Sequence, residues 1–341
     1  LRKRIYARID ADGIVLVSGK GKRKTPIQRL SEWIDQCLAK LKQYTKDIHI
    51  CGNRNSFSKT DHDATFMHMK EDYMRNGQLK PGYNVNVATC SDFIIGSYIS
   101  SDRNDVHTLI PFMEQLRKNY AGRNIGSVVV DSGYESEENY CWFEAHPETE
   151  LYVKPSNHEA VKHRKYRTDI SRRENMAYDA QTDTYTCANG KLLQRTQEKK
   201  MHTASGLEIA TSVYECNECD GCPLKEKCIR ACGSKKPLEE RYKVIYVSKR
   251  FARQRQAMEA KISSPKGCLL RVNRSIQAEG NFAYVKQDLD FRRFLLRGNM
   301  KVAAEWLLFS LALNILHLHH KIQNRRLGSG LKIPSSFPAG L

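Results

Sequence analysis

The stretch GSVVVDSGY, residues 126–134, places Asp131 where a hydrophobic run meets a turn. Three consecutive valines predict a buried strand, and the Ser-Gly pair that follows the acid predicts a turn. An aspartate in this position commonly caps the turn that follows a strand, so Asp131 alone does not indicate a functional site. Its meaning depends on a second acid elsewhere in the chain.

That second acid is Glu279, in the stretch RSIQAEGNFAYVK of residues 274–286. Glu279, Phe282, Ala283 and Lys286 recur at a spacing that places them on one face of an α-helix. We therefore expect Glu279 to share a face with packing residues, where its charge needs a partner such as a metal ion or Lys286. A carboxylate that leaves a strand and another on a packed helix can clamp divalent metal ions over a phosphodiester.

The composition favours a polyanionic partner. The chain has 341 residues, 56 Lys and Arg against 38 Asp and Glu, and a formal net charge of +18. Its length allows roughly two domains. A solvated basic surface is the simpler alternative, but this excess of positive charge favours nucleic acid. The longest apolar run, 302–313, is interrupted by Glu305 and predicts a core helix rather than a membrane span.

The chain begins without an initiator Met and without the apolar segment of a signal peptide, so we expect a piece of a longer protein. Near this start, Ile5–Ile9 and Ile14–Val17 flank an Asp-Gly pair and predict a hairpin. Thr25-Pro26 predicts the start of a helix that continues to about Tyr44.

The middle of the chain predicts a mixed α/β domain. The expected elements are a hairpin of Tyr83–Ala88 and Phe93–Ile99, a helix capped by Asn104-Asp105, the strand ending at Asp131, a helix capped by Ser136, and a strand at Leu151–Val153. This order requires at least one parallel crossover. After residue 155 a basic, cysteine-rich segment with strands at Tyr185–Leu193 and Glu208–Cys216 predicts an inserted subdomain, and helices follow at Ile276–Lys286 and Met300–Ile322.

These patterns predict five parts: an N-terminal hairpin and helix (1–50), the first part of the α/β domain (51–155), the insert (156–265), a helical continuation of the domain (266–325) and a loose tail (326–341).

Cysteines cluster in the insert, where the stretch CNECDGCPLKEKC spans residues 216–228 and Cys232 follows. Closely spaced thiolates next to Gly or Pro suit tetrahedral Zn²⁺. Four of the candidate ligands Cys187, Cys216, Cys219, Cys222 and Cys228 would be needed. An iron–sulfur cluster uses similar spacings and stays open as an alternative. Reduced thiols that bind a metal are favoured over disulfides, because the sequence has no secretory signal.

Basic clusters occur at Lys20–Lys24, His163–Arg173 and Arg292–Arg297. Such clusters are usually solvated faces, but here aromatic residues alternate with arginine, which fits phosphate contact beside packing. Arg292, Arg293 and Arg297 follow the helix of Glu279 closely and are the best candidates for holding DNA.

Together these motifs resemble the DDE transposases of bacterial insertion sequences, in the branch with a cysteine-rich insert before the glutamate. The resemblance runs from about Cys51 to Ile322 and rests on the segments 58–67, 76–85, 130–134, 219–228, 275–286 and 291–298. It implies a ribonuclease-H-like fold with three acids that bind two Mg²⁺ or Mn²⁺ ions, and DNA cleavage with strand transfer by in-line attack. It also implies double-stranded DNA as partner, a homo-oligomer, and action in the bacterial cytoplasm.

The resemblance assigns individual residues. Asp131 matches the second acid, Glu279 the third, and Lys286 the lysine that contacts DNA phosphate. The arginine expected four positions before the glutamate is replaced by Ser275, and Arg274 stands one place off.

The first acid of the family normally lies in an Asp-Gly-Thr motif, which this chain lacks. We expect that acid upstream of the chain, with Asp61, Asp63, Asp10 and Asp12 as weaker candidates within it. Two other functions stay open: a non-catalytic, zinc-containing DNA-binding protein derived from the same fold, and a stand-alone metal-dependent nuclease.

Overall fold

The structure is a computed structural model and describes residues 1–69, 74–203, 205–230, 236–328 and 330. Cys232 and most of the predicted tail (326–341) lie outside the described residues. The chain divides into two compact units. The N-terminal unit comprises Leu1–Tyr83, Ser101–Arg103 and Leu296–Val302, and the main unit comprises the rest.

The N-terminal unit begins with two helices, α1 (Arg2–Ala11) and α2 (Pro26–Cys51), followed by the strand pair β1 (Thr65–Met67) and β2 (Lys80–Gly82). The predicted start of α2 is confirmed, because Thr25 accepts a hydrogen bond from the Gln28 N–H at 3.3 Å and Pro26 occupies the first turn. The helix continues past Tyr44 to Cys51.

The hairpin predicted at residues 5–17 is wrong, since α1 occupies its first half. Ile5 and Ile9, one helical turn apart, are buried together with Ile34. The Asp-Gly pair ends this helix instead of turning a hairpin: Gly13 has a φ of +61°, and the Ile14 N–H donates to the Ile9 carbonyl at 3.0 Å.

The main unit contains the predicted α/β elements in the predicted order. They are β3 (Asn84–Cys90), β4 (Phe93–Ser100), a 3₁₀ turn (Asp105–His107), α3 (Leu109–Asn119), β5 (Ser127–Val130), α4 (Glu137–Glu144) and β6 (Glu150–Val153). β3 and β4 are antiparallel, whereas β5 and β6 are parallel, with Val130 opposite Val153. Ser136 caps α4 by accepting from the Asn139 N–H at 3.0 Å. The parallel crossover is confirmed.

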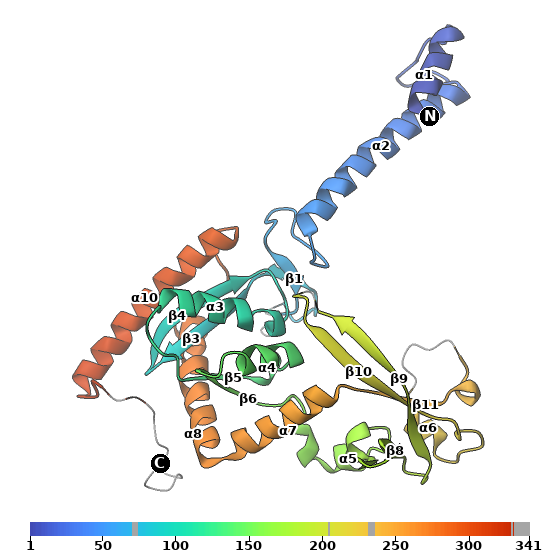
Figure 1. Cartoon of the computed structure of the whole chain (residues 1–341). Coiled ribbons are helices and arrows are strands. Elements are labelled where there is room, and N and C mark those ends of the chain that lie inside the picture. The colour runs from blue at the N-terminus through green and yellow to red at the C-terminus, as the bar shows by residue number, and fades with distance from the viewer. Residues whose placement is uncertain (70–73, 204, 231–235, 329, 331–341) are drawn as a thin grey trace. The chain divides into compact units, whose positions relative to one another are not determined.

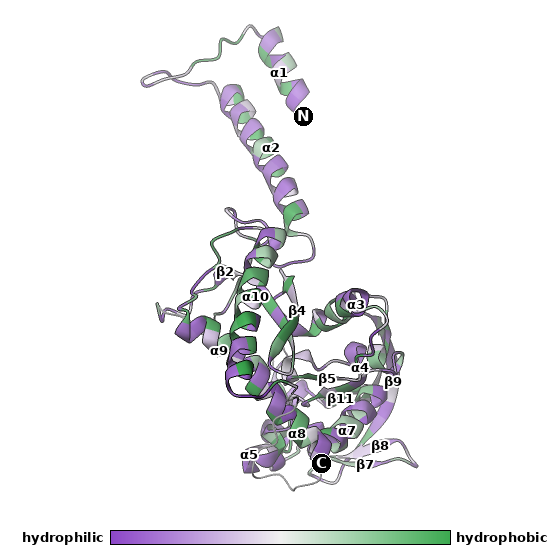
Figure 2. Cartoon of the chain, turned by 90° about the vertical axis from the view of Figure 1, so that its left-hand side faces the viewer, coloured by the Kyte–Doolittle hydropathy of each residue, from purple (hydrophilic) through white to green (hydrophobic). Residues whose placement is uncertain are grey.

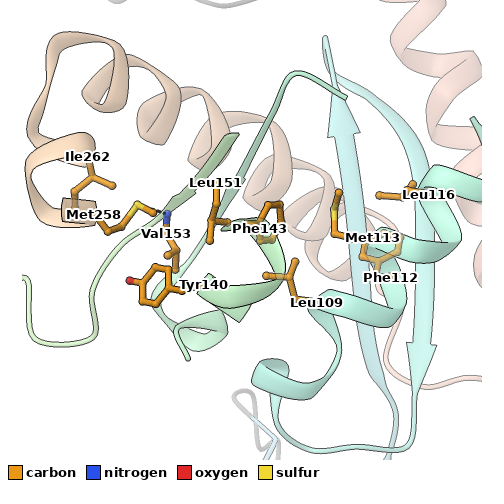
Figure 3. Close-up of a cluster of buried hydrophobic side chains, with 10 residues drawn as sticks. All are labelled: Leu109, Phe112, Met113, Leu116, Tyr140, Phe143, Leu151, Val153, Met258 and Ile262. Carbon is orange, nitrogen blue, oxygen red and sulfur yellow. Dashed lines mark hydrogen bonds between the residues drawn. The ribbon is translucent and has the colours of Figure 1, made fainter. Parts of the chain in front are cut away.

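These four strands form two separate two-stranded sheets in the described part of the chain (Figure 1). The mixed α/β class is confirmed, while the ribonuclease-H-like arrangement stays a prediction. Figure 3 shows the core beside them, in which α3, α4 and β6 pack against α7 (Lys249–Ser263). Its buried members are Leu109, Phe112, Met113, Leu116, Tyr140, Phe143, Leu151, Val153, Met258 and Ile262.

The cysteine-rich segment contributes one antiparallel five-stranded sheet in the order β11-β10-β9-β8-β7. Its strands are β7 (Ala177–Asp179), β8 (Thr184–Thr186), β9 (Leu192–His202), β10 (Glu208–Cys216) and β11 (Lys243–Val247), with short helices α5 (Arg164–Arg167) and α6 (Lys225–Cys228) beside them in sequence. The strand predicted at Tyr185–Leu193 is split by a turn at Gly190, whose φ is +73°. The strand predicted at Glu208–Cys216 is confirmed.

The helix that carries Glu279 changes its winding along its length. α8 (Pro265–Arg274) continues into a π-helical turn (Ser275–Glu279), then α9 (Gly280–Ala283), then a second π-helical turn (Tyr284–Asp288). Five of its buried residues recur at every fourth position, namely Leu269, Asn273, Gln277, Asn281 and Val285, and Gly267 and Leu270 are buried as well. An α-helix has 3.6 residues per turn and a π-helix has more, so alternating the two keeps this four-residue column on one face.

The last helix, α10 (Asn299–Gln323), is the one predicted at Met300–Ile322. Trp306 and Leu313 are buried in a cluster with Ile94 and Val285, as expected of a core helix. Other apolar residues of α10, coloured green in Figure 2, are exposed, among them Leu307, Leu311 and Ile315. By length and apolar composition α10 could also cross a membrane, which is weak evidence by itself.

Candidate functional site

Asp131 lies directly after β5 and begins a 3₁₀ turn, Ser132–Tyr134. Its Oδ1 accepts a hydrogen bond from the Gly133 N–H at 2.8 Å, so the carboxylate is oriented by the backbone of its own turn. The side chain is 44% exposed, and Oδ2 lies 3.7 Å from Arg274 Nη1. The predicted strand–acid–turn arrangement is therefore confirmed.

Behind Asp131 lies a buried polar network centred on Asn86 of β3. The hydroxyls of Tyr134 and Thr108 both donate to Asn86 Oδ1, the latter at 2.8 Å. Asn86 and Thr108 are almost completely buried. Burial, together with the negative charges of Asp105 and Asp131, raises the pKa of Tyr134, which keeps its hydroxyl protonated as a donor.

The loop after this turn is fixed by a buried ion pair. Arg255 of α7 donates to both oxygens of Glu135, each at 2.8 Å, and the Glu135 side chain is only 1% exposed. The Ser156 N–H adds a third hydrogen bond at 2.8 Å. Burial by itself would raise the pKa of Glu135, but these donors hold that pKa below its usual value.

Glu279 occupies a different environment. Its side chain is 63% exposed, Arg274 Nη2 donates to Oε1 at 2.7 Å, and the Ser275 hydroxyl donates to Oε2 at 3.0 Å. The expectation that Glu279 shares a face with packing residues is wrong, because the π-helical turn brings Gln277 to the core face instead. An α-helical spacing misassigns the faces wherever the winding widens.

Arg274 links the two acids. Its Nη2 bonds Glu279, and its Nη1 approaches Asp131. In an α-helix only residues three or four positions apart face each other. The π-helical turn also brings Arg274, five positions before Glu279, into contact with it. This contact was not predicted from the sequence, in which the four-residue spacing of Asn273, Gln277 and Asn281 was the available signal.

Comparison with known proteins bears on this helix directly. Residues 186–319 match the family model described as a transposase DDE domain. This match supports a DDE-type transposase. The match includes Glu279, Lys286 and the five candidate cysteines, while Asp131 lies before its start. No curated protein and no solved structure matches the chain significantly. The match supports a transposase function in general, and the mixed α/β fold is compatible with it.

The weaker candidates for a first acid lie in the N-terminal unit and make structural contacts there. Asp10 and Asp12 lie at the end of α1, where Asp12 pairs with Arg8 at 2.6 Å. Asp61 accepts from the Tyr83 hydroxyl at 2.7 Å and from the Gly298 N–H at 3.2 Å. Asp63 accepts from the Asn299 N–H at 2.9 Å. Asp61 and Asp63 thus satisfy backbone donors at the start of α10.

The basic residues after Glu279 alternate with aromatic residues that point inward. Phe291 and Phe294 contact Trp306 edge-on, while Arg292, Arg293 and Arg297 are exposed. Arg292 pairs with Asp290, and Arg297 donates to the Thr60 carbonyl at 3.3 Å within the N-terminal unit. Lys286 is half-buried, with Nζ 6.0 Å from the Phe282 ring centroid. Exposed guanidinium groups beside packed rings suit phosphate contact.

The five candidate cysteines lie at the end of β10, in the loop and short helix after it, and after β8. Cys216, Cys219 and Cys228 are buried, and Cys187 packs against the same cluster as Cys216. Burial raises the pKa of Cys216 to about 11 and also raises that of Cys228. Within the part of the chain that the structure describes, no three His, Cys, Asp or Glu side chains are arranged to hold a metal ion. The zinc site stays a prediction.

Proposed function

We propose that this transposase cleaves and joins DNA strands by in-line attack on phosphodiester bonds, with Asp131 and Glu279 at the reacting centre. One observation carries the proposal: both predicted carboxylates converge on the single guanidinium of Arg274, at 3.7 Å and 2.7 Å. The two acids come from a strand end and a helix far apart in sequence. Their convergence is what shared binding of a cation requires.

The residues fit a divalent cation by two criteria. Carboxylate oxygens are the ligands that Mg²⁺ and Mn²⁺ prefer. Asp131 and Glu279 also already share a positive partner, Arg274, which stands where a cation would neutralise both. Bound divalent ions would supply activation of the attacking hydroxyl and stabilisation of the leaving oxygen. Arg274 must release at least one carboxylate for such binding, and its guanidinium would then be available for a phosphate.

DNA would be held by the basic surface. Lys286, Arg292, Arg293 and Arg297 are our candidates for phosphate contacts, supported by the exposure of the three arginines and by the net charge of +18. We also propose that four of Cys187, Cys216, Cys219, Cys222 and Cys228 bind Zn²⁺ and stabilise the fold of the insert. Oligomeric action on paired DNA ends in the bacterial cytoplasm completes the proposal.

A non-catalytic DNA-binding protein is the second candidate. The pairing of Arg274 with both acids favours it, because a site neutralised by its own arginine needs no metal ion. Both candidates predict salt-dependent DNA binding, and only the transposase activity requires Asp131 and Glu279.

The deciding experiment is nicking of supercoiled plasmid DNA by the chain in Mg²⁺ or Mn²⁺. Asp131→Asn and Glu279→Gln should abolish nicking and keep DNA binding, whereas Asp288→Asn, an exposed acid on the same helix, should change neither. Binding without nicking by the unaltered chain would favour the non-catalytic protein. Cleavage of element ends without strand joining would favour a stand-alone nuclease.

A further inference from the structure

The apolar residues of α2 form a stripe that continues beyond the contact of this helix with α1. They recur at alternating steps of three and four residues, at Ile27, Leu30, Ile34, Cys37, Leu41, Tyr44 and Ile48. This is the heptad spacing of helices that pair along a common apolar seam. α1 packs on the first part of the stripe, because its Ile5 and Ile9 are buried together with Ile34.

α1 covers the stripe only as far as Asp35. At the start of α1, Arg2 pairs with Asp35 at 2.5 Å. Beyond the end of α1, the Val17 carbonyl accepts from Gln28 Nε2 at 2.6 Å, so the two helices run antiparallel. α2 nevertheless continues to Cys51. Its later part therefore extends a seam whose first part is already packed.

The later part of the stripe is exposed. Green patches along α2 in Figure 2 mark its apolar residues. Cys37 is exposed, and Leu41, Tyr44 and Ile48 are 60%, 57% and 71% exposed. The distance along the helix from Cys37 to Ile48 is about 16 Å, at a rise of about 1.5 Å per residue. A continuous apolar stripe of this kind marks an interaction surface for another helix.

The stripe can pair with itself in the antiparallel direction. Under two-fold symmetry the same residues of both copies form the interface, and every contact occurs twice. Leu41 then packs opposite Tyr44 of the second copy, and Cys37 packs opposite Ile48 of that copy. The α2 helix of the second copy would run in the same direction as α1 and follow it along the same seam.

Charges beside the stripe favour this direction. In the antiparallel pair, Lys40 lies beside Asp47 of the second copy, so two pairs of opposite charge flank the seam. In a parallel pair the corresponding neighbour of Lys40 is Thr45, which carries no charge. Charge complementarity thus selects both a second copy of α2 and its orientation.

We propose that residues 37–48 of α2 pair with the same residues of a second copy of this chain as a short antiparallel coiled coil. The inference deepens the oligomeric action included in the proposed function, because it names the surface through which two copies associate. The association requires neither Asp131 nor Glu279.

The first test is sedimentation equilibrium of the full chain without DNA or metal ions. The unaltered chain should dimerise, and Leu41→Glu should raise the dissociation constant about a hundredfold or more, because it places a charge in the apolar seam of both copies. Leu41 is exposed in the single chain, so the melting temperature of the monomer should change little. Ala39→Glu, which adds the same charge at an exposed position facing away from the seam, is the matched control and should dimerise normally.

The second test determines the orientation. Lys40→Asp or Asp47→Lys alone places like charges together and should weaken the dimer about fivefold, and the two changes combined should restore it. The thiol introduced by Ile48→Cys should form a disulfide with Cys37 of the second copy under mild oxidation, identified by peptide mass spectrometry. A disulfide between the Cys37 residues of two copies would indicate a parallel pair and overturn the inference.

The inference and the proposed strand chemistry are tested separately. A chain that stays monomeric throughout the micromolar range, or Leu41→Glu that dimerises as tightly as Ala39→Glu, would refute the inference and leave the plasmid-nicking result standing. Asp131→Asn and Glu279→Gln should dimerise like the unaltered chain. Retained nicking in those two variants would refute the proposed chemistry and leave the interface of α2 standing.

Discussion

The strand end that carries Asp131 and the helix that carries Glu279 hold their acids in different ways. Asp131 is oriented by a backbone N–H of its own turn, with the buried Asn86 network and the Glu135–Arg255 pair around that turn. Glu279 is mostly exposed and is held by Arg274 and Ser275 from its own helix.

This difference separates a rigid part of the site from an adjustable one. Buried hydrogen bonds and ion pairs are costly to break, whereas exposed ion pairs contribute little free energy and exchange easily. The strand end thus supplies a fixed reference, and the helix supplies an acid whose partner can change. Changes at the strand end should therefore affect stability, and changes at Arg274 should affect ion binding.

The largest effect on stability is expected for Glu135→Ala. It removes one partner of a buried ion pair and leaves Arg255 without its carboxylate, which should cost about 3–5 kcal/mol of unfolding free energy. Urea denaturation, monitored by circular dichroism, measures the loss of unfolding free energy. Glu114→Ala, an exposed glutamate of α3, should cost far less. Equal losses for the two variants would mean that the strand end is not the rigid part.

A smaller loss is expected for Asn86→Ala. The Tyr134 and Thr108 hydroxyls would lose their common acceptor inside the protein, at about 1–3 kcal/mol for a buried polar group left unsatisfied. Thermal and urea unfolding would show the change. Asn124→Ala, at an exposed position before β5, is the matched control. An unchanged stability of Asn86→Ala would contradict a supporting role of this network.

Low pH should lower the stability that Glu135 contributes to the strand end. Because the folded pKa of Glu135 is below its usual value, its contribution to stability is complete above that usual value and is lost as the pH falls through the lowered pKa. Melting temperatures measured from neutral pH down to about pH 3 should fall more steeply for the unaltered chain than for Glu135→Gln. Parallel curves would show that Glu135 does not carry this pH dependence.

Arg274→Ala should have the smallest effect on stability, about 1 kcal/mol or less, because its partner Glu279 is exposed. Mn²⁺ binding should become tighter, because the substitution removes a positive charge that competes with Mn²⁺ for the carboxylates of Asp131 and Glu279. Arg292→Ala removes one charge at an exposed position and serves as control. Weaker Mn²⁺ binding in Arg274→Ala alone would mean that the arginine organises the ion site rather than competes for it.

The sequence predicted the elements whose signals are local. Thr25-Pro26 and Ser136 mark helix starts, because capping depends on a few neighbouring residues. The three valines before Asp131 mark a strand, as predicted, although they are half-buried rather than buried. The hairpin predicted for the segment 5–17 was wrong, because an Asp-Gly pair can end a helix as readily as it turns a hairpin.

The candidate site was predictable only in part. Asp131 and Glu279 could be named from their motifs, and both contact Arg274 in the structure. The position of Asp105 beside Gly133 could not be predicted, because it depends on the tertiary packing of segments that are apart in sequence. The contact between Arg274 and Glu279 was hidden by the assumption of regular α-helical winding.

The four-residue column in the Glu279 helix has a consequence for drawing this segment as a helical wheel. A column that repeats every four residues advances about 90° per residue, against about 100° in an α-helix. Over the sixteen steps from Leu269 to Val285 the two angles diverge by about 160°. A standard wheel would therefore place these two buried residues on nearly opposite sides, although one face of the helix buries both.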